Sequence, residues 1–234
     1  MHLFYCPTAP EINVLDETES QHAIKVLRLE IGSEIEITNG KGELFLARIV
    51  SGNFKKCGFE IVKTISTQIA PDFYIHIAIA PTKSSDRIEW FIEKCVEIGI
   101  QEISFIQCNH SEKKNLNLER SIKVAVSAMK QSQKAYLPKI NGLQNFKQFL
   151  GQTKAQEKFI AYVADANAPN IHLLQVATKQ TNYLVLIGPE GDFSPEEITL
   201  ALQNNYRPIA LGTSRLRTET AGIAACHTLQ LVQV

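Results

Sequence analysis

The stretch that decides the fold spans residues 183–225, which read YLVLIGPEGDFSPEEITLALQNNYRPIALGTSRLRTETAGIAA. It holds two strand-like apolar runs, residues 183–187 and 208–211, and each continues through a glycine loop into a helix signal. Short apolar strands that enter helices through glycine loops build parallel sheets, and such sheets bind ligands at the carboxyl ends of their strands. We therefore expect two neighbouring loops that share one pocket.

Both loops end at residues that favour the start of a helix. In the first, Ser194 is a good N-cap, Pro195 suits the first turn and Glu197 completes a capping box. In the second, Thr218 is the expected N-cap of an apolar helix that runs to about residue 232. The same strand, loop and helix unit therefore occurs twice in tandem.

The second loop also carries charged side chains in close succession. Arg215, Arg217 and Glu219 follow Gly212 within a few residues. Glycine is the default residue of tight turns, so a single unit of this kind would indicate only a turn. Turning does not require two guanidinium groups and a carboxylate, and their presence makes the loop a candidate for binding or catalysis.

Here the sequence resembles a known family. The strings LIGPEGDFSPEE and ALGTSRLRTETA are similar to the two C-terminal signature motifs of the SPOUT, or α/β-knot, methyltransferases. More narrowly, they resemble the bacterial family that methylates N3 of a uridine in 16S ribosomal RNA. Residues 22–28 (HAIKVLR), 93–99 (EKCVEIG) and 131–132 (QS) extend the resemblance along the chain. It implies an S-adenosylmethionine-dependent methyltransferase that acts on the small ribosomal subunit.

The resemblance also implies a fold and an assembly. Residues 1–70 are expected to form a small PUA-like, RNA-binding β-barrel domain. Residues 73–234 are expected to form an α/β domain with a parallel sheet, whose C-terminal segment is threaded into a trefoil knot. The family pairs through the C-terminal domain, so we expect a homodimer; the apolar last helix agrees, although a core helix would look the same.

Residue patterns support the same division independently of the resemblance. Residues 34–38 alternate polar with apolar, turn at residues 39–42 (NGKG) and return at residues 44–50, which is typical of a β-hairpin. A third strand is expected at residues 58–62, and a helix is expected to start at Ser20. Residues 66–72 have the composition of a linker.

Beyond that linker the chain alternates strand and helix signals, which predicts a parallel sheet covered on both faces. Strands are predicted at residues 73–80, 102–107, 158–164, 183–187 and 208–211. Helices are predicted at residues 86–98, where Gly99 is the stop signal, and 118–136, which ends before Pro138.

S-adenosylmethionine requires backbone donors and acceptors, apolar walls and small residues where it contacts the chain. The expected lining is Leu186, Ile187, Gly188, Pro189, Gly191, Leu211, Gly212 and Leu216. Neither GxGxxG nor GxxxxGK[ST] occurs, which argues against a dinucleotide or a nucleoside triphosphate.

Methylation of uridine N3 requires removal of a proton and stabilisation of the negative charge left on the base. Arg217 is the candidate for stabilising that charge. Glu219, or as a second choice Glu190, is the candidate for accepting the proton or for holding Arg217 in place. Glu219 is equally consistent with a carboxylate that favours the helix N-terminus.

The chain departs from the family pattern at a few positions. The family has a second glycine where this chain has Asp192, an aliphatic residue at Arg215, Gly-Arg at residues 133–134 and an arginine near His2. These departures concern details of RNA contact more than the fold.

Charge is balanced overall, with 24 Lys and Arg against 24 Asp and Glu, which is unexpected for a nucleic-acid-binding protein. Residues 110–139 are nevertheless basic, and a second small group lies on the N-terminal helix. The RNA-binding candidates are Lys25, Arg28, Lys113, Lys114, Lys123, Lys130 and Lys134. Solvated surface cations are an equally good interpretation of either group. Two modest patches on two domains bind well only when both are engaged, so we expect an assembled small subunit to be preferred to free RNA.

The cysteine and histidine content and the hydropathy of the chain indicate its cellular compartment and whether it binds metal. Five cysteines without CxxC spacing, and no apolar run long enough to span a membrane, indicate a reducing cytoplasm and no membrane association. The scattered histidines and cysteines give no indication of a metal site.

Two other functions stay open from sequence. One is a non-catalytic RNA-binding module with a degenerate cofactor pocket. The other is a different small-molecule enzyme that uses residues 188–191 as an anion cradle at a helix N-terminus. Binding of S-adenosylmethionine would distinguish the first from a methyltransferase.

Overall fold

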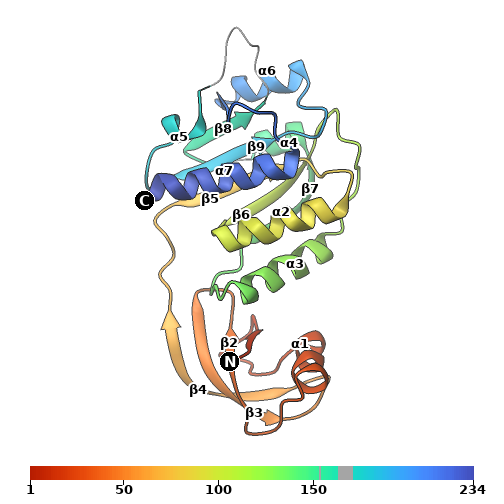
Figure 1. The fold of residues 1–234 in the computed structure, drawn as a ribbon, viewed down its shortest axis with the longest axis vertical. Coiled ribbons are helices and arrows are strands. Elements are labelled where there is room, and N and C mark those ends of the chain that lie inside the picture. The colour runs from red at the N-terminus through yellow and green to blue at the C-terminus, as the bar shows by residue number, and fades with distance from the viewer. Residues whose placement is uncertain (153, 163–170) are drawn as a thin grey trace. The chain divides into compact units, whose positions relative to one another are not determined.

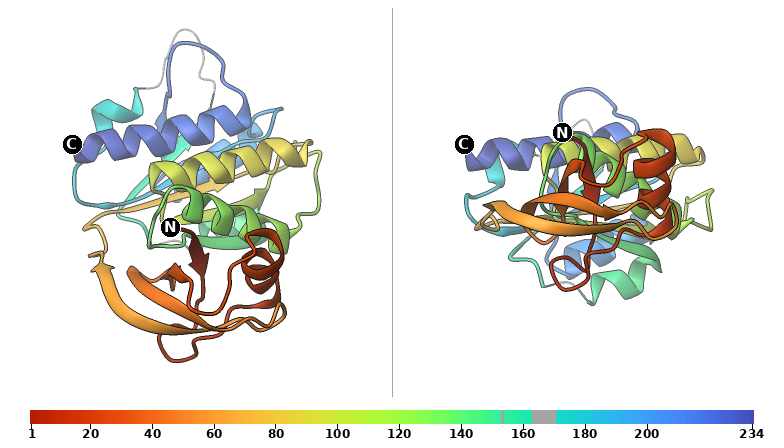
Figure 2. Two further views of the ribbon diagram at one scale, coloured as in Figure 1. Left: turned by 60° about the horizontal axis from the view of Figure 1, so that its bottom comes forward. Right: turned by 90° about the horizontal axis from the view of Figure 1, so that it is seen from below.

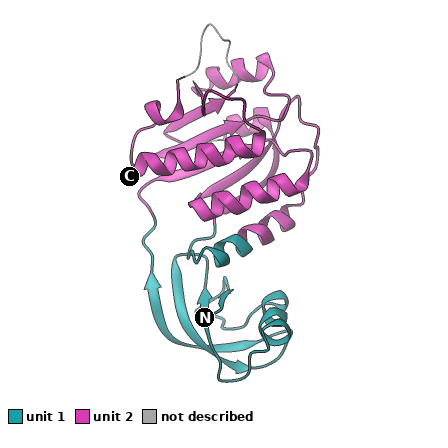
Figure 3. Cartoon of the chain, viewed as in Figure 1, with its two compact units in different colours: residues 1–70, 126–137 teal, residues 71–125, 138–234 magenta. Residues whose placement is uncertain are grey.

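The structure is a computed structural model that describes residues 1–152, 154–162 and 171–234. The chain divides into two compact units, shown in Figure 3. Unit 1 comprises residues 1–70 and 126–137, and unit 2 comprises residues 71–125 and 138–234.

Unit 1 is built on a four-stranded sheet in the order β1-β2-β3-β4. Its strands are β1 (Leu3–Tyr5), β2 (Glu34–Thr38), β3 (Glu43–Ser51) and β4 (Gly58–Thr67). β1 pairs with β2 in parallel, and the other neighbours are antiparallel. The predicted hairpin is confirmed: Asn39 Oδ1 accepts hydrogen bonds from the backbone N–H groups of Lys41 (2.8 Å) and Glu43 (3.3 Å). The alternation along β2 buries Ile35 and Ile37 in the core of the unit.

The N-terminal helix begins earlier than its sequence indicates. α1 (Glu17–Gln21) is capped by Asp16, whose side chain accepts from the N–H of Glu19 at 2.8 Å, and it continues into the π-helix η1 (His22–Val26). The predicted start at Ser20 is therefore wrong. Ser20 is buried instead, and its hydroxyl oxygen accepts a hydrogen bond from the N–H of Cys57 at 2.9 Å.

Helix α3 (Leu118–Gln131) is shorter than predicted. It stops at Gln131 because Gln133 takes a left-handed conformation, with φ 53°, that a helix cannot continue. Its second half and the residues that follow belong to unit 1, where the carbonyl of Ala135 accepts from the N–H of Gly42 at 2.9 Å and the N–H of Leu137 donates to Gly40 at 2.9 Å.

Unit 2 is built on a six-stranded, fully parallel sheet in the order β10-β8-β9-β5-β6-β7. Its strands are β5 (Tyr74–Ile79), β6 (Glu102–Gln107), β7 (Lys139–Asn145), β8 (Glu157–Ala161), β9 (Asn182–Ile187) and β10 (Arg207–Ile209). The predicted α/β class and all five predicted strands are confirmed. The predicted end of one strand at Ala164 lies outside the described residues. The sequence did not indicate β7, and the knotted threading stays a prediction.

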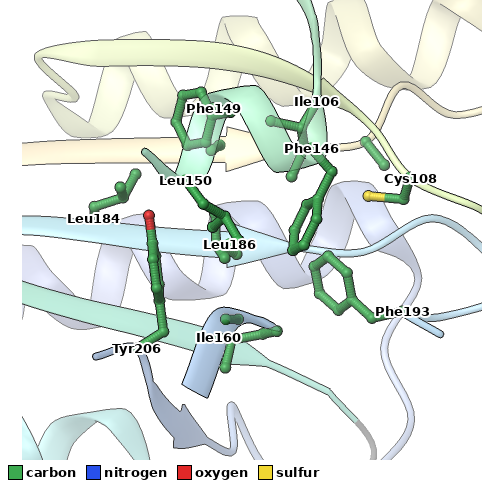
Figure 4. Packing of buried hydrophobic residues seen from close by; sticks show 13 residues of the cluster. Ile106, Cys108, Phe146, Phe149, Leu150, Ile160, Leu184, Leu186, Phe193 and Tyr206 are labelled. Carbon is green, nitrogen blue, oxygen red and sulfur yellow. The ribbon is translucent and has the colours of Figure 1, made fainter. Parts of the chain in front are cut away.

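Helices cover both faces of this sheet (Figures 1 and 2). α2 (Ser85–Ile98) and α7 (Thr218–Gln233) pack side by side on one face. They approach closely at Gly222, where an added Cβ would lie 2.4 Å from the Phe91 ring. On the other face, α4 (Phe146–Leu150) and α6 (Pro195–Gln203) cover an apolar cluster that includes Leu184 and Leu186 (Figure 4). The short helix α5 (Leu173–Val176) contacts α7. No helix among the described residues has the length and apolar content needed to cross a bilayer.

A polar cluster lies at the amino ends of β5, β6 and β7. His76 Nε2 is 2.8 Å from Ser104 Oγ, and the Glu102 carboxylate accepts from Tyr74 Oη and Lys139 Nζ, each at 3.0 Å. Burial lowers the pKa of His76 to about 4, although the neighbouring Glu102 favours its charged form. The folded unit therefore holds His76 neutral at physiological pH.

Candidate functional site

The two glycine loops identified in the sequence meet at one pocket of unit 2. The loop after β9 and the loop after β10 lie at the carboxyl ends of their strands, on either side of β8. With the start of α2, the end of β8 and residues 171–175, they line an open pocket of about 1250 Å³. The predicted shared pocket is therefore present, at the edge of the sheet where parallel α/β folds bind ligands.

The β9–α6 loop is held in place by side chains at both of its ends. The predicted capping box is present: Ser194 Oγ accepts from the N–H of Glu197 at 3.3 Å, and Glu197 Oε2 accepts from the N–H of Ser194 at 2.9 Å. Asn109, from the loop after β6, donates its backbone N–H to Glu197 and its side-chain amide to Ser194. Gly188 leaves room for the Phe193 ring, which would lie 3.1 Å from an added Cβ. This loop is a preformed wall of the pocket.

The β10–α7 loop is exposed and is joined to the first loop by Thr218. The hydroxyl of Thr218 donates to the carbonyl of Gly188 at 3.1 Å. Helix α7 begins at Thr218, so Arg217 occupies the N-cap position and Thr218 does not cap the helix as predicted. Gly212 has φ +149°, and an added Cβ there would meet no heavy atom within 4 Å. The space beside this backbone is open to a ligand.

Six of the eight predicted cofactor-binding residues line this pocket. They are Ile187, Gly188, Pro189, Leu211, Gly212 and Leu216. Leu186 does not, because side chains alternate along β9 and that of Leu186 packs into the cluster under α4 and α6. Gly191 also lies outside the lining, and its backbone faces His110, whose Cβ would be 3.0 Å from an added Cβ. The remaining lining residues were not predicted from sequence: Lys83, Ser84, Arg87, Ala161, Tyr162, Ile171, His172, Gln175, Asp192, Ile209, Ala210, Thr213, Ser214, Thr218 and Ala221.

The predicted catalytic residues have different surroundings. Arg217 lines the pocket, and its guanidinium makes no hydrogen bond or ion pair with a described residue. Glu190 also lines the pocket and accepts a hydrogen bond from the N–H of Lys83 at 3.1 Å. Glu219 is buried and accepts from Arg87 Nη1 at 2.8 Å. The structure therefore groups Arg217 with Glu190 on the lining of this pocket, and Arg217 also lines a second hollow together with the paired Glu219 and Arg87.

Arg87 is a site residue that the sequence did not reveal. It lies in the first turn of α2, far along the chain from Glu219, and no motif joins the two. Its side chain is 42% exposed and lines the same pocket as Arg217. With Arg215, whose guanidinium lies 3.5 Å from the Glu190 carbonyl, three arginine residues line this pocket. Such a lining suits a ligand with negative charge.

The predicted RNA-binding cations of unit 2 differ in whether they already bond to another side chain of the protein. Lys114 is exposed, and Lys113 Nζ donates to Ser85 Oγ at 2.6 Å. Lys123 forms an ion pair with Glu119 at 2.7 Å on the exposed face of α3. An exposed pair of this kind is weak and can be exchanged for a phosphate at small cost.

The predicted RNA-binding cations of unit 1 include one that is not on its surface. Lys130 is mostly buried and is bonded to the buried carboxylate of Glu19, so the expected exposed position of Lys130 is wrong. Lys134 is half-buried, and Lys25 and Arg28 are exposed. Arg28 was predicted to lie on the helix, and this is wrong. It follows the C-cap of η1 and has φ 54°.

Comparison with known proteins identifies the family. Residues 70–230 match the family described as RNA methyltransferase domain, and residues 15–62 match the RNA methyltransferase PUA domain. The chain belongs to the RNA methyltransferase family. The family resemblance expected from the loop motifs is confirmed.

Named relatives and solved structures cover nearly the whole chain. Ribosomal RNA small subunit methyltransferase E of Mesomycoplasma hyopneumoniae is 33% identical over 86% of each chain. The protein of that name in Buchnera aphidicola is 27% identical over 92% of this chain and 86% of its own. A crystal structure from Porphyromonas gingivalis, described as "probable rRNA-methyltransferase", is 41% identical over 99% of each chain, with a TM-score of 0.89. A Legionella pneumophila methyltransferase structure, solved with bound SAM, is 26% identical over 99% of this chain and 97% of its own, with a TM-score of 0.89.

Two departures from the family pattern coincide with unusual backbone. Asp192 and Gln133 occupy positions where the pattern has glycine, and their φ angles are 62° and 53°. Glycine adopts such angles without strain, whereas residues with a Cβ adopt them rarely. Both residues of this chain therefore adopt a conformation that glycine would adopt without strain.

Proposed function

We propose that this protein is an S-adenosylmethionine-dependent methyltransferase that methylates N3 of a uridine in 16S ribosomal RNA. One observation carries the proposal: in a chain of the RNA methyltransferase family, two glycine loops meet at a single pocket whose lining includes Arg217. Relatives named as small subunit ribosomal RNA methyltransferases support the choice of substrate.

The pocket has the chemistry that S-adenosylmethionine needs. Ile187 and Leu211 provide apolar walls, and Gly188 and Gly212 allow the backbone to approach a ligand closely. The Legionella pneumophila relative was solved with SAM bound, which supports the same cofactor here. The volume, about 1250 Å³, is sufficient for a ligand of that size, since ordinary small-molecule pockets have roughly 300–1,000 Å³.

The charged side chains of the lining then have distinct roles. When bound, S-adenosylmethionine supplies an electrophilic methyl group. Uridine N3 must lose its proton, and the resulting negative charge spreads onto the ring carbonyl oxygens. Arg217 stabilises that charge, because its guanidinium is not engaged with another described residue. Glu190 accepts the proton, since this residue lines the pocket and its carboxylate is bonded to the N–H of Lys83, another lining residue.

Glu219 acts through Arg87 in this proposal. Its buried carboxylate is committed to the Arg87 guanidinium at 2.8 Å, and it does not line the cofactor pocket. Glu219 therefore fixes the direction of Arg87 and ties the start of α7 to the start of α2. Because Arg87 lines the pocket, that orientation determines where a third cation faces the ligand.

We propose that residues 1–70 form an RNA-binding domain and that residues 73–234 form the catalytic domain, which also contacts the RNA. The match of residues 15–62 to an RNA methyltransferase PUA domain supports the first assignment. The contacts proposed for unit 2 are Lys113, Lys114 and Lys123, and those proposed for unit 1 are Lys25, Arg28 and Lys134. Lys130 is left out because Glu19 already neutralises it.

The proposed substrate is the assembled small subunit in the cytoplasm. The net charge of the chain is zero, so each of the two groups of exposed cations can neutralise only a few phosphates. Two such groups bind well only when an ordered RNA presents phosphates to both at once. The protein is proposed to act as a homodimer that pairs through unit 2, where Leu231 of α7 is 49% exposed. A stable, active monomer in sedimentation would contradict the dimer.

The direct test maps modified bases in small-subunit RNA from cells that lack the protein. Loss of one N3-methyluridine is expected, with its return when the gene is restored. In parallel, S-adenosylmethionine at 100 times its dissociation constant should stabilise the protein by about 2.7 kcal/mol in a thermal shift. A protein that binds RNA but shows no such shift would be a binding module instead of an enzyme.

A further inference from the structure

Unit 1 exposes an aromatic ring beside a cation. Phe54 lies in the turn between β3 and β4 and is 39% exposed. Lys25 Nζ lies 3.9 Å from the centroid of its ring. A single exposed aromatic side chain is common on protein surfaces, so its surroundings decide what it indicates.

The turn that carries Phe54 is ordered by its own hydrogen bonds. Asn53 accepts from the N–H of Lys55 with its side chain, at 2.9 Å, and from the N–H of Lys56 with its carbonyl, at 3.1 Å. The next residue, Cys57, donates its N–H to Ser20 Oγ of α1 at 2.9 Å. The ring is therefore presented by a turn fixed to the N-terminal helix, which favours a binding role over a mobile loop tip.

The backbone on the helix side is irregular at the residues that carry cations. Lys25 lies in the π-helix η1, and such segments are rare and frequently found at functional sites. Arg28 has φ 54°, an unfavourable conformation for a residue with a Cβ. Both irregularities coincide with exposed positive side chains.

The charge in the two adjoining segments has one sign. Residues 1–70 contain seven Lys and Arg and nine Asp and Glu. Four of those seven cations, Lys25, Arg28, Lys55 and Lys56, lie within residues 20–29 and 51–59, which contain no Asp or Glu. All four are exposed. A ring with one ammonium over its face and two further cations in its own turn matches the chemistry of single-stranded nucleic acid, which offers flat bases and phosphates.

We propose that Phe54 is a stacking platform for an unpaired nucleobase of RNA, and that Lys25 beside its ring and Lys55 and Lys56 of the same turn bind the flanking phosphates. The inference rests on the proposed function, in which RNA is the substrate. Stacking accepts any base because every base has a π face. In the free protein the Lys25 ammonium covers the ring, and its flexible stem lets it move to a phosphate when a base arrives.

The test measures binding of a fluorescein-labelled oligouridine of about 12 nucleotides, within the site size of single-strand-binding folds. Phe54→Ala is expected to weaken binding by about 5- to 150-fold, the loss of one base stack. Phe54→Trp should retain binding, and in a Trp90→Phe background its fluorescence should be quenched by the RNA, because Trp90 is the single tryptophan. Lys55→Ala should lower the salt slope by about 0.7, the value for one phosphate on a single strand.

Lys63→Ala is the matched control, because Lys63 is an exposed cation of the same unit outside both segments. It should leave affinity and quenching unchanged. Unchanged affinity of Phe54→Ala for oligouridine overturns the proposal, as does a loss confined to assembled small subunits, which would indicate a protein contact. Failure of the proposed function would appear separately, as wild-type protein that neither binds S-adenosylmethionine nor transfers a methyl group.

Discussion

Gly212→Ala is expected to weaken cofactor binding without unfolding the protein. Gly212 has φ +149°, a backbone conformation that residues with a Cβ rarely adopt. An added Cβ would meet no heavy atom within 4 Å, so the substitution introduces backbone strain but no clash inside the protein. The residue lies on the lining of the pocket, where the β10–α7 loop must hold its shape for a ligand.

The magnitude follows from that strain. A residue held in a sparsely populated backbone conformation costs about 1–3 kcal/mol. The exposed loop can relieve the strain by leaving the binding conformation, so the free energy of unfolding changes little. The fraction of molecules whose loop is in the binding conformation falls instead. The apparent dissociation constant for S-adenosylmethionine therefore rises by about 5- to 150-fold.

Calorimetric titration with S-adenosylmethionine measures this change. Gly32→Ala is the matched control, because Gly32 has φ +93° and also has no heavy atom within 4 Å of an added Cβ, but it belongs to unit 1. Gly32→Ala should keep the wild-type affinity. Wild-type affinity in Gly212→Ala, or an equal loss in both variants, would refute the argument that the loop conformation forms the pocket.

Three further predictions concern catalysis, packing and pH. Arg217→Ala should bind S-adenosylmethionine almost normally and lose turnover by about 10²- to 10³-fold, measured as methyl transfer under saturating cofactor; unchanged turnover would make Arg217 structural. Gly222→Ala should lower the free energy of unfolding by about 1–3 kcal/mol in urea, because the new Cβ would lie 2.4 Å from the buried Phe91 ring; wild-type stability would show that α2 and α7 can separate freely. Because burial lowers the pKa of His76 from 6.5 to about 4, the unfolded chain binds the proton more readily, and stability should fall as the pH drops from about 6.5 to 4; His76→Asn should reduce that fall.

Local signals predicted much of the fold and most of the pocket. The apolar runs of β5, β6, β8, β9 and β10 predicted their strands, and the Ser194 capping box fixed the start of α6. The glycine loops predicted where the ligand site lies, because a parallel sheet places the carboxyl ends of its strands at one edge.

The predictions that failed concern features set by contacts between residues far apart in the chain, or by the alternation of side chains along a strand. Strand β7, which reads KINGLQN, is polar and is recognised only by its pairing with β6. The Arg87–Glu219 pair joins residues 132 positions apart, and no local pattern connects them. Lys130 has a partner in Glu19, 111 positions away, so a helix pattern alone placed it at the surface.

One error was avoidable from sequence. Leu186 and Ile187 are adjacent in a strand, and adjacent strand residues point to opposite faces. Only one of them could line the pocket, and the structure assigns that place to Ile187.

Residues 1–70 are not a clean deletion unit, which affects how the substrate preference is tested. Residues 126–137 pack into unit 1, where Ala135 and Met129 are buried. Removing residues 1–70 would expose this segment of α3 and the chain after it. Point variants of the exposed cations, such as Lys114→Ala, are the sounder means of testing whether the preference for assembled subunits depends on both patches.

The most direct test of the central claim is methyl transfer to isolated small subunits. Purified protein, labelled S-adenosylmethionine and small subunits from cells that lack the protein are combined, and the modified base is mapped. The proposal predicts label at N3 of one uridine, which blocks Watson–Crick pairing and stops reverse transcription there, with faster transfer than to free 16S ribosomal RNA. Protein that binds S-adenosylmethionine but leaves the subunits unlabelled, or that places the methyl group on another atom, would contradict it.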